Sequence, residues 1–580
     1  EYCFSLKKLT FEISNNAIGK AFYTHIRGLY HQRSGIAKKP PYTEWVMGAD
    51  HKESWKGGFI PTESEYSTKQ QSPYGFRDQN GNPVTLKHFT MVHETATDKK
   101  LPDVWGGWWD AGDFDRRQQH FRIVEDLLSA YLMYPGKFKD GQQHIPESGN
   151  GVPDIVDEVL WCMEMWRRAQ SPNGGIGCWI EADSHPTEWN PSKDKQRYYL
   201  AAPTVHSSLR YSIHAGLTAM ALRKCGQKEL ADKYIKSAEK AFVYAISPNN
   251  AYSVSWEHYD EKARRKVLWS YRENPDLPKD LLFRAALHLF ILTSNQGYYR
   301  YLKPDAFGYT LMRSSYPYTP FSLTALAVTK DIFPEYRDRL RREILGRAHT
   351  WMRYQDEAAY RTLWYPAGHK YFLNMSWGNV MPFTKGRYLA AAYYFTGRKQ
   401  FRDALLLAND WMLGTNPMGR SFTTGLGRNR PIRVLSLASY TDGILQPLPG
   451  ITQYTFTSRI AYRAKTMVYA LQYNKRPSHQ FKGLDMCLLP KTLTGGRKSL
   501  SYDEMSAIMD RFRPIWRRYS NIEQYSVEQN EFTVWETIGP CAAVTACLLP
   551  DNWQPPEKWK HEKPKEKLSE IECVFLTNST

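Results

Sequence analysis

The stretch "GGWWDAGDFDRRQQHFRIVEDLLSAYLMY", Gly106–Tyr134, joins an acidic, aromatic loop to an amphipathic segment. In its second half the apolar residues recur three and four positions apart, at Val124, Leu127, Leu128, Tyr131 and Leu132. That spacing places them on one face of a helix. The first half sets two tryptophans beside Asp110, Asp113 and Asp115. A carboxylate pair for catalysis, a cation site and an acidic helix start are the three explanations for this loop.

The same helical periodicity dominates the rest of the chain. It recurs in residues 155–166, 213–220, 230–242, 279–293, 336–353, 381–395, 399–413, 457–472 and 531–548. Glycine or proline clusters separate these segments, and no alternating βαβ pattern is present. So many one-sided helices exceed a four-helix bundle, and a closed ring of helical hairpins buries them economically. No fixed-period repeat favours an open solenoid. The sequence predicts an all-α fold, an α/α barrel with long irregular loops.

Three segments do not follow this pattern. Residues 1–19 contain a strand-like run and are predicted to be a linker or the remnant of a preceding β module. Residues 20–550 form the predicted catalytic barrel, within which 40–105 is a long segment rich in Gly, Pro and polar residues. Long loops in compact domains are often functional. Residues 551–580 are rich in proline and lysine and are predicted to be a C-terminal tail.

The net charge of +18 raises the question of a nucleic-acid partner. Phosphate binding requires clustered Lys and Arg, whereas here basic residues alternate with acids at helical spacing, as in "YRDRLRREILGR". We therefore expect solvated helix faces and no nucleic-acid partner. The aromatic content of 14% suits either a large core or a groove that stacks flat rings on sugars.

Cysteine usage and hydropathy argue against a local zinc site and a membrane span. The eight cysteines form no CxxC pair, and no HExxH motif is present, so a zinc site made from neighbouring ligands is not expected. No apolar run reaches the roughly 18 residues of a membrane span. No signal peptide precedes Glu1, and because the chain does not begin with Met we expect a trimmed N-terminus.

Asp110 and Asp113 are separated by Ala and Gly, which allow a tight turn and let both carboxylates converge. Two carboxylates can hold one water, one removing its proton while the other orients it. An acidic helix N-terminus explains the same letters, and a calcium loop would need more oxygen ligands. Inverting glycoside hydrolysis would pair Asp113 with a distant general acid. Glu528, Glu531 and Glu536, in "YSVEQNEFTVWETIGPCAAV", are the candidates and cannot be ranked by themselves.

Five motifs in order resemble those of glycoside hydrolase family 9. They are "GGWWDAGDFD", "IPESGNGVPDIVDEVLWCMEMWRRAQ", "SWGNV", "LGTNPMGRSFTTGLGRN" and "QNEFTVWETIGPCAAV". The similarity runs over residues 20–550. It implies an (α/α)6 barrel that cleaves β-linked glucan, with β-1,4-glucan favoured, by single-displacement inversion. It makes Asp113 the general base, Asp110 its partner on the water and Glu531 the general acid. The alternatives are a catalytically inert glycan-binding barrel and a basic anion- or nucleic-acid-binding protein.

One departure from the family pattern concerns the loop at 428–454. The family usually carries a histidine there that holds the sugar, and this chain has arginines but no histidine. The three carboxylates are unaffected, while the identity of the substrate is open.

The remaining predictions concern substrate and surroundings. Tryptophan faces stack on sugars, and His, Arg and Asn bond to hydroxyls. The predicted substrate-binding residues are Trp108, Trp109, His120, Arg117, Trp377 and Asn416. Core packing is the alternative for each tryptophan. We expect no required cofactor, allow a structural calcium ion with unknown ligands, and expect an oligo- or polysaccharide substrate, a monomer, and a secreted, periplasmic or cell-surface location.

Overall fold

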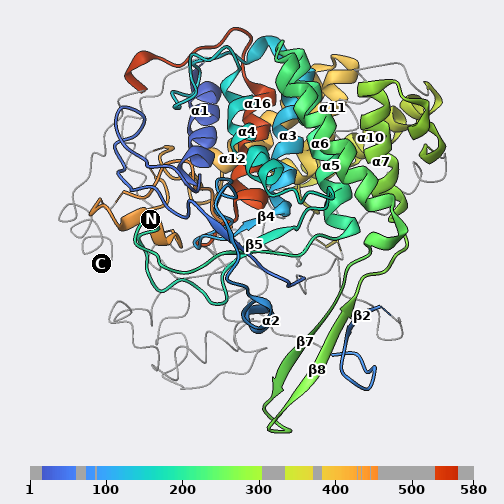
Figure 1. The fold of residues 1–580 in the computed structure, drawn as a ribbon. Helices are drawn as coiled ribbons and strands as arrows, with labels where there is room; N and C mark the ends of the chain where they lie inside the picture. Colours follow the sequence, from blue (N-terminus) through green and yellow to red (C-terminus); the bar gives the residue numbers. More distant parts are fainter. Residues whose placement is uncertain are drawn as a thin grey trace.

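The computed structural model describes residues 16–60, 74–84, 88–302, 334–358, 360–366, 368–369, 382–427, 429–432, 434–444, 446–454 and 530–559. Its helices stand side by side above a layer of short strands (Figure 1). The helices are α1 (Asn16–His31), α2 (His88–Thr95), α3 (Phe121–Met133), α4 (Asp154–Arg168), α5 (Val205–Lys224), α6 (Lys228–Ile246), α7 (Lys279–Thr293), α10 (Pro334–Glu357), α11 (Pro382–Thr396), α12 (Lys399–Leu413) and α16 (Gly539–Leu548).

Contacts between these helices link the two ends of the described chain. Helix α5 packs on α3, α6 and α7, and α11 packs on α10 and α12. Helix α16, near the end of the described chain, packs on α1, α3 and α11. Because the last helix contacts the first, the one-sided helices bury their apolar faces around a common centre. The predicted α/α barrel is confirmed.

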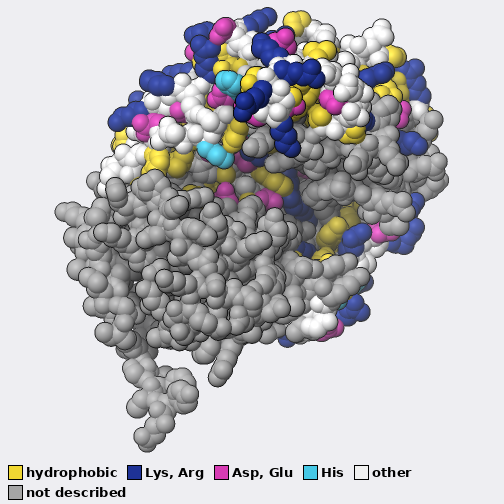
Figure 2. All heavy atoms as spheres, turned by 90° about the horizontal axis from the view of Figure 1, so that it is seen from below, with side chains coloured by type: hydrophobic (Ala, Val, Ile, Leu, Met, Phe, Trp, Pro, Cys, Tyr) yellow, Lys and Arg dark blue, Asp and Glu magenta, His cyan; other side chains and the backbone are white. Residues whose placement is uncertain are grey.

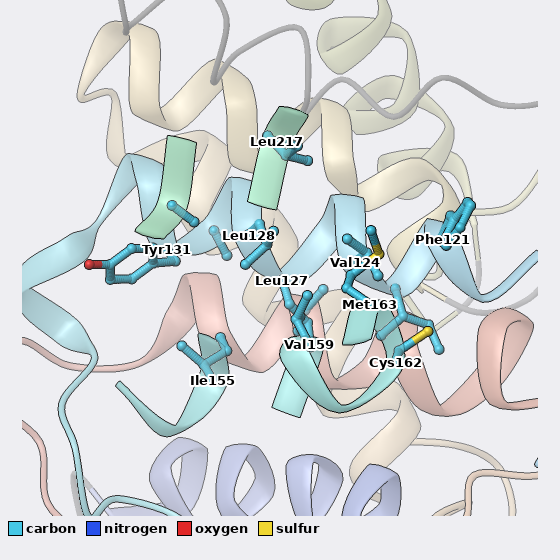
Figure 3. Close-up of a cluster of buried hydrophobic side chains, with 14 of the residues drawn as sticks. Phe121, Val124, Leu127, Leu128, Tyr131, Ile155, Val159, Cys162, Met163 and Leu217 are labelled. Carbon is cyan, nitrogen blue, oxygen red and sulfur yellow. The ribbon is translucent and has the colours of Figure 1, made fainter. Parts of the chain in front are cut away.

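The core around α3 shows why the opening stretch folds as it does. Its apolar stripe packs between α4 and α5 (Figure 3). Val124, Leu127 and Leu128 are fully buried. They meet Val159 and Met163 of α4. The three-and-four spacing in the sequence therefore corresponds to the face that enters the barrel core.

The structure also contains two small β-sheets, which the all-α prediction did not include. A five-stranded sheet has the order β3-β1-β6-β5-β4, and a three-stranded sheet has the order β2-β8-β7. The strands are β1 (Ser54–Lys56), β2 (Gly75–Arg77), β3 (Lys100–Leu101), β4 (Arg116–Arg117), β5 (Trp179–Glu181), β6 (Tyr199–Leu200), β7 (Ser253–Asp260) and β8 (Arg265–Arg272). Six of them have two or three residues, too few to show a period of two. The β7–β8 hairpin projects away from the barrel (Figure 1). Its "SVSW" start alternates polar and apolar residues, as is typical of a strand.

The ends of the described chain lie together on the barrel. Residues 16–19, predicted to belong to the linker, form the first turn of α1, while residues 1–15 lie outside the described residues. The Trp553 ring meets Phe22 of α1 edge-on with a centroid distance of 6.1 Å, and Trp559 lies 5.8 Å from Tyr23. The start of the predicted tail thus packs on α1. None of the described helices combines the length and hydropathy that a membrane span requires.

Candidate active site

Backbone hydrogen bonds fix the acidic loop at the head of α3. The amide of Trp109 donates to the carbonyl of Gln32, just beyond the end of α1, at 2.8 Å. The amide of Asp110 donates to the Asp115 carbonyl at 2.9 Å, so the loop closes on itself. Ala111 and Gly112 occupy the turn between. A β-carbon at Gly112 would lie 2.5 Å from the Leu435 carbonyl oxygen, so the close approach of residues 435–436 requires glycine.

The segment that carries Glu531 bonds to this loop although it lies more than 400 residues later. The Val534 amide donates to the Asp110 carbonyl at 2.7 Å. Residues 435–437 bridge the two segments: the Leu435 amide donates to the Asn530 carbonyl at 2.8 Å, and the Leu437 amide donates to the Gly112 carbonyl at 3.1 Å. The fold thus brings together the two segments that carry the three predicted catalytic residues.

Asp110 is held on both carboxylate oxygens. His120 Nε2 lies 2.9 Å from its Oδ1, and Arg117 Nε lies 3.5 Å from its Oδ2. The side chain of Asp110 is only 5% exposed, and that of His120 is fully buried. The prediction that His120 binds the sugar is wrong for this structure, because the ring has no exposed surface and contacts Asp110 instead.

Asp113 is the exposed member of the aspartate pair. Its side chain is 27% exposed, and His185 Nδ1 lies 3.7 Å from its Oδ2. Burial alone would raise the pKa of Asp113, but His185, Asp115 and the Arg117 charge together hold that pKa below the ordinary value. The carboxylate is therefore ionised and reachable, as a general base must be.

The sequence analysis did not predict that His185 lies at the site. It follows β5 in the run "IEADSHP", where an acidic residue and a histidine share a short polar loop. Its ring packs edge-on against Phe89, with a centroid distance of 4.7 Å. Contact with Asp113 raises the pKa of His185.

The five-stranded sheet positions Arg117 among the carboxylates. Pairing of β4 with β5 sets Arg117 opposite Trp179, and the guanidinium lies 4.2 Å from a ring centroid of that tryptophan. It donates to Asp115 and lies 3.5 Å from Glu181. Burial lowers the Arg117 pKa, but Asp115, Asp110 and Glu181 raise it well above its ordinary value. Arg117 thus holds the carboxylates, and its sugar contact stays a prediction.

Trp108 and Trp109 support the loop from the core. Their exposed fractions are 0% and 1%. The indole of Trp108 donates to Glu158 at 2.8 Å, and that of Trp109 donates to Asp50 at 2.9 Å. Rings that are enclosed on all sides have no free face for a sugar, so the prediction that they wall the site is corrected.

Asn416 is also a structural residue in the turn after α12. Its amide donates to the Trp411 carbonyl at 2.8 Å and to the Arg420 carbonyl, while its oxygen accepts from the Met418 amide at 3.1 Å. Both ends of the side chain are used inside the turn, so its predicted role in substrate binding is corrected. Trp377 and the rival acid Glu528 lie outside the described residues.

Glu531 and Glu536 differ in their surroundings. Glu536 accepts hydrogen bonds from the Tyr454 hydroxyl at 2.6 Å and from the Thr533 hydroxyl at 3.2 Å. Burial first, and then the charge of Asp110, raise the pKa of Glu536. Glu531 lies in the extended run before the π-helical turn Val534–Ile538 (η9), and its carbonyl accepts from the Tyr454 amide at 2.9 Å. Glu536 therefore braces the segment on which Glu531 is presented.

The described surface and the described side chains were also compared with what an anion site or a metal site requires. On the face seen in Figure 2, the described Lys and Arg side chains are interspersed with acidic and apolar ones. Within the part of the chain that the structure describes, no group of three or more His, Cys, Asp or Glu side chains is arranged to hold a metal ion. The structural calcium ion stays a prediction.

The chain is similar in sequence to several curated glucan-cleaving enzymes. The cellulose 1,4-β-cellobiosidase of Acetivibrio thermocellus is 25% identical over 466 residues, which cover 73% of this chain and 48% of that protein. Endoglucanase C of Cellulomonas fimi is 26% identical, covering 56% of this chain and 30% of that protein. The xyloglucan-specific endo-β-1,4-glucanase of Bacteroides ovatus is 22% identical, covering 67% of each. The chain thus spans about half or less of the first two relatives.

Solved structures show the same fold. A metagenome-derived glycoside hydrolase family 9 endoglucanase superposes with a TM-score of 0.60 at 23% identity, covering 92% of this chain and 81% of that one. A Bacteroides ovatus family 9 structure gives a TM-score of 0.65 at 17% identity, covering 93% and 84%. These neighbours agree with the (α/α)6 barrel. The model of "Glycosyl hydrolase family 9" matches residues 19–454, a span that includes Asp110 and Asp113. The chain belongs to glycosyl hydrolase family 9.

Proposed function

We propose that the chain hydrolyses β-1,4-linked glucan with inversion at the anomeric carbon. Asp113 is the general base, Asp110 orients the water, and Glu531 is the general acid. The observation that carries this proposal is the hydrogen-bond network that ties the Asp110–Asp113 loop to the segment around Glu531. The names of the relatives, a cellobiosidase and endoglucanases, support a β-1,4-glucan substrate.

The proposed step is a single displacement. Asp113 removes a proton from water while the water oxygen bonds to the anomeric carbon. The glycosidic carbon–oxygen bond breaks on the opposite face, and Glu531 donates its proton to the departing sugar oxygen. Asp110, fixed by His120 and Arg117, accepts the other proton of the water as a hydrogen bond. Two carboxyl groups supply the acid and the base, so we propose that turnover needs no organic cofactor.

The test is turnover of cello-oligosaccharides, carboxymethyl cellulose and xyloglucan, with the product anomer identified by NMR. Asp113→Asn and Glu531→Gln are each expected to reduce kcat by about 10²–10⁴-fold. Glu536→Gln tests the rival acid on the same segment and should retain far more activity than Glu531→Gln. Binding of these glycans by the wild type without any turnover would instead identify an inert glycan-binding barrel.

The proposed polymeric substrate also bears on where the enzyme is located. We propose that the protein is secreted, periplasmic or on the cell surface, where an insoluble glucan is met. We also propose that it acts as a monomer, since one chain supplies all three carboxyl groups. Cell fractionation with an antibody, and sedimentation velocity of the purified chain, test these two proposals.

A further inference from the structure

His51 lies between two buried carboxylates, those of Asp50 and Asp194. Its Nδ1 lies 2.8 Å from Asp50 Oδ2, and its Nε2 lies 3.1 Å from Asp194 Oδ2. No more than 4% of any of these three side chains is exposed. The His51 ring packs on Tyr198 and Phe114, with centroid distances of 4.4 Å and 5.5 Å. Together the three polar residues form the Asp50–His51–Asp194 cluster.

Asp50 joins this cluster to the acidic loop. Its carboxylate accepts from the Trp109 indole at 2.9 Å, and Trp109 directly precedes Asp110. At the other end of the aspartate pair, Phe114 directly follows Asp113 and packs on the histidine ring of the cluster. The Trp109 and Phe114 rings also contact each other, with centroids 5.3 Å apart. Both residues that flank the aspartate pair are therefore in contact with the cluster.

Asp194 joins the cluster to the loop between β5 and β6. Its Oδ2 also accepts from the Tyr198 hydroxyl at 3.0 Å, and its Oδ1 accepts from the Gln196 amide at 3.1 Å. The same loop carries His185, which contacts Asp113. One buried ring thus connects the segment that bears the aspartate pair with the segment that bears its histidine partner.

The hydrogen bonds define the charge of the cluster. Burial alone would raise the pKa of Asp50 and of Asp194, but hydrogen bonds from His51 hold both pKa values below the ordinary one. An ionised carboxylate can only accept a hydrogen bond. Both ring nitrogens of His51 therefore donate, and the ring carries a positive charge between two negative ones. Such charge-assisted bonds are about twice as strong as neutral ones.

We propose that His51, as an imidazolium between Asp50 and Asp194, is a positioning residue for the aspartate pair. This inference rests on the proposed roles of Asp110 and Asp113. Through Asp50 and the Phe114 contact, the charged ring fixes both ends of the Asp110–Asp113 turn. Through Asp194 it fixes the β5–β6 loop against that turn.

His51→Gln tests this role. The amide has donors at one end only, so its oxygen must face one of the two carboxylates. We expect kcat on cello-oligosaccharides to fall by roughly 10²-fold. KM should change little, because the cluster is buried and offers no surface to substrate. The matched control is His258→Gln in the β7–β8 hairpin, where the ring lies 2.8 Å from Glu94 and stacks on Trp269. There kcat should stay at the wild-type value.

A second substitution separates positioning from a general loss of stability. In the double variant His51→Gln/Asp194→Asn, the asparagine amide can donate to the glutamine oxygen. Its kcat should therefore recover severalfold relative to His51→Gln. Unchanged kcat in His51→Gln overturns the proposal, and so does a double variant that is no more active than His51→Gln. An equal loss in His258→Gln overturns it as well.

NMR of protein labelled with ¹⁵N in histidine needs no activity. At about pH 6 both ring nitrogens of His51 should carry a proton, and one bare nitrogen overturns the proposal. Contact with Asp113 raises the pKa of His185 above 6.5, and in His51→Gln that pKa should move back toward 6.5 as the loop loosens. An unchanged His185 titration also overturns the proposal.

These measurements keep the two proposals apart. A wild-type protein that turns over none of the glucans contradicts the proposed function, while the NMR experiment still decides the role of His51. Circular dichroism checks the fold of each variant. If His51→Gln does not fold, Asp194→Asn replaces it in the kinetic and NMR experiments, with the same expected results.

Discussion

At the scale of single residues, the site depends on which side chains are enclosed. Asp110 and His120 are both buried and bonded to each other, whereas Asp113 keeps 27% of its side chain exposed. The enclosed aspartate is thereby fixed in place, and the exposed one is available for proton transfer. Their different exposure is consistent with the different roles proposed for the two acids of this loop.

His120→Ala is expected to leave Asp110 without its partner on Oδ1. Misplacement of a positioning group costs roughly 10²-fold in rate, so kcat should fall by about that factor. KM should change little, because the ring has no surface for substrate. Steady-state kinetics on cello-oligosaccharides measures both constants. His93→Ala is the control, since His93 is 74% exposed and pairs with Asp183. A rise in KM at constant kcat would instead make His120 a substrate ligand.

At the scale of elements, backbone hydrogen bonds join the two segments that carry the proposed catalytic residues. Residues 435–437 lie between the acidic loop and the Glu531 segment and bond to both. Helix α4 supports the same loop from the core through Glu158, which accepts from both Trp108 and Arg33. Packing of the loop therefore has two separable supports, one on each side.

Gly112→Ala tests the support from residues 435–437. The added β-carbon would lie 2.5 Å from the Leu435 carbonyl, so one of the two segments must move. We expect a loss of kcat of roughly 10²-fold together with a lower Tm. Activity assays and thermal unfolding measure these effects. Gly136→Ala, at a position with no neighbouring atom within 4 Å, should change neither. Wild-type activity in Gly112→Ala would show that the contact is not needed.

Glu158→Gln tests the support from α4. Arg33 and Glu158 are both fully buried and 2.9 Å apart, and without the Glu158 charge Arg33 keeps only its pair with the partly exposed Glu147. The free energy of unfolding should fall by about 1–3 kcal/mol. Glu164→Gln is the matched control on the same helix, because its pair with Arg167 is about one third exposed and its loss should cost less than about 1 kcal/mol. Urea unfolding measures both, and equal losses would contradict the expectation.

At the scale of the whole molecule, polar contacts join distant parts of the chain inside the barrel. His25 of α1 lies 3.3 Å from the Thr545 hydroxyl of α16 and 3.2 Å from the Thr423 hydroxyl. Burial lowers the pKa of His25 to about 3. The folded protein therefore holds this ring neutral at a junction of three segments.

His25→Asn should weaken the dependence of the free energy of unfolding on pH below about 6.5. The unfolded chain binds a proton at His25 below about pH 6.5, whereas the folded chain does so only near 3. The stability from neutral His25 is thus present above 6.5 and is lost as pH falls toward 3, at up to ~1.4 kcal/mol per pH unit. Urea unfolding at pH 8 and pH 5 should show a smaller difference in the variant than in the wild type. An equal difference would mean that His25 does not contribute.

Much of the barrel is predictable because helices carry their own signal. The stripe at residues 279–293 coincides with α7, and that at 399–413 coincides with α12. Such segments bury one face whatever their partners, so spacing alone reveals them. The short strands gave no such signal, since two or three residues show no period. Their existence depends on partners supplied by distant segments.

The sequence by itself determined the helical segments, the closed ring and the three carboxyl groups that the motifs mark. Only the tertiary structure decided which neighbouring side chains are enclosed. The sequence predicted sugar ligands at Trp108, Trp109, His120 and Asn416. In the folded chain the first three side chains are buried in the core, and Asn416 forms its hydrogen bonds within a turn. The fold also brings His185 to the proposed base. The physical reason is that burial and long-range contact are properties of the packed chain, and local spacing carries no information about either.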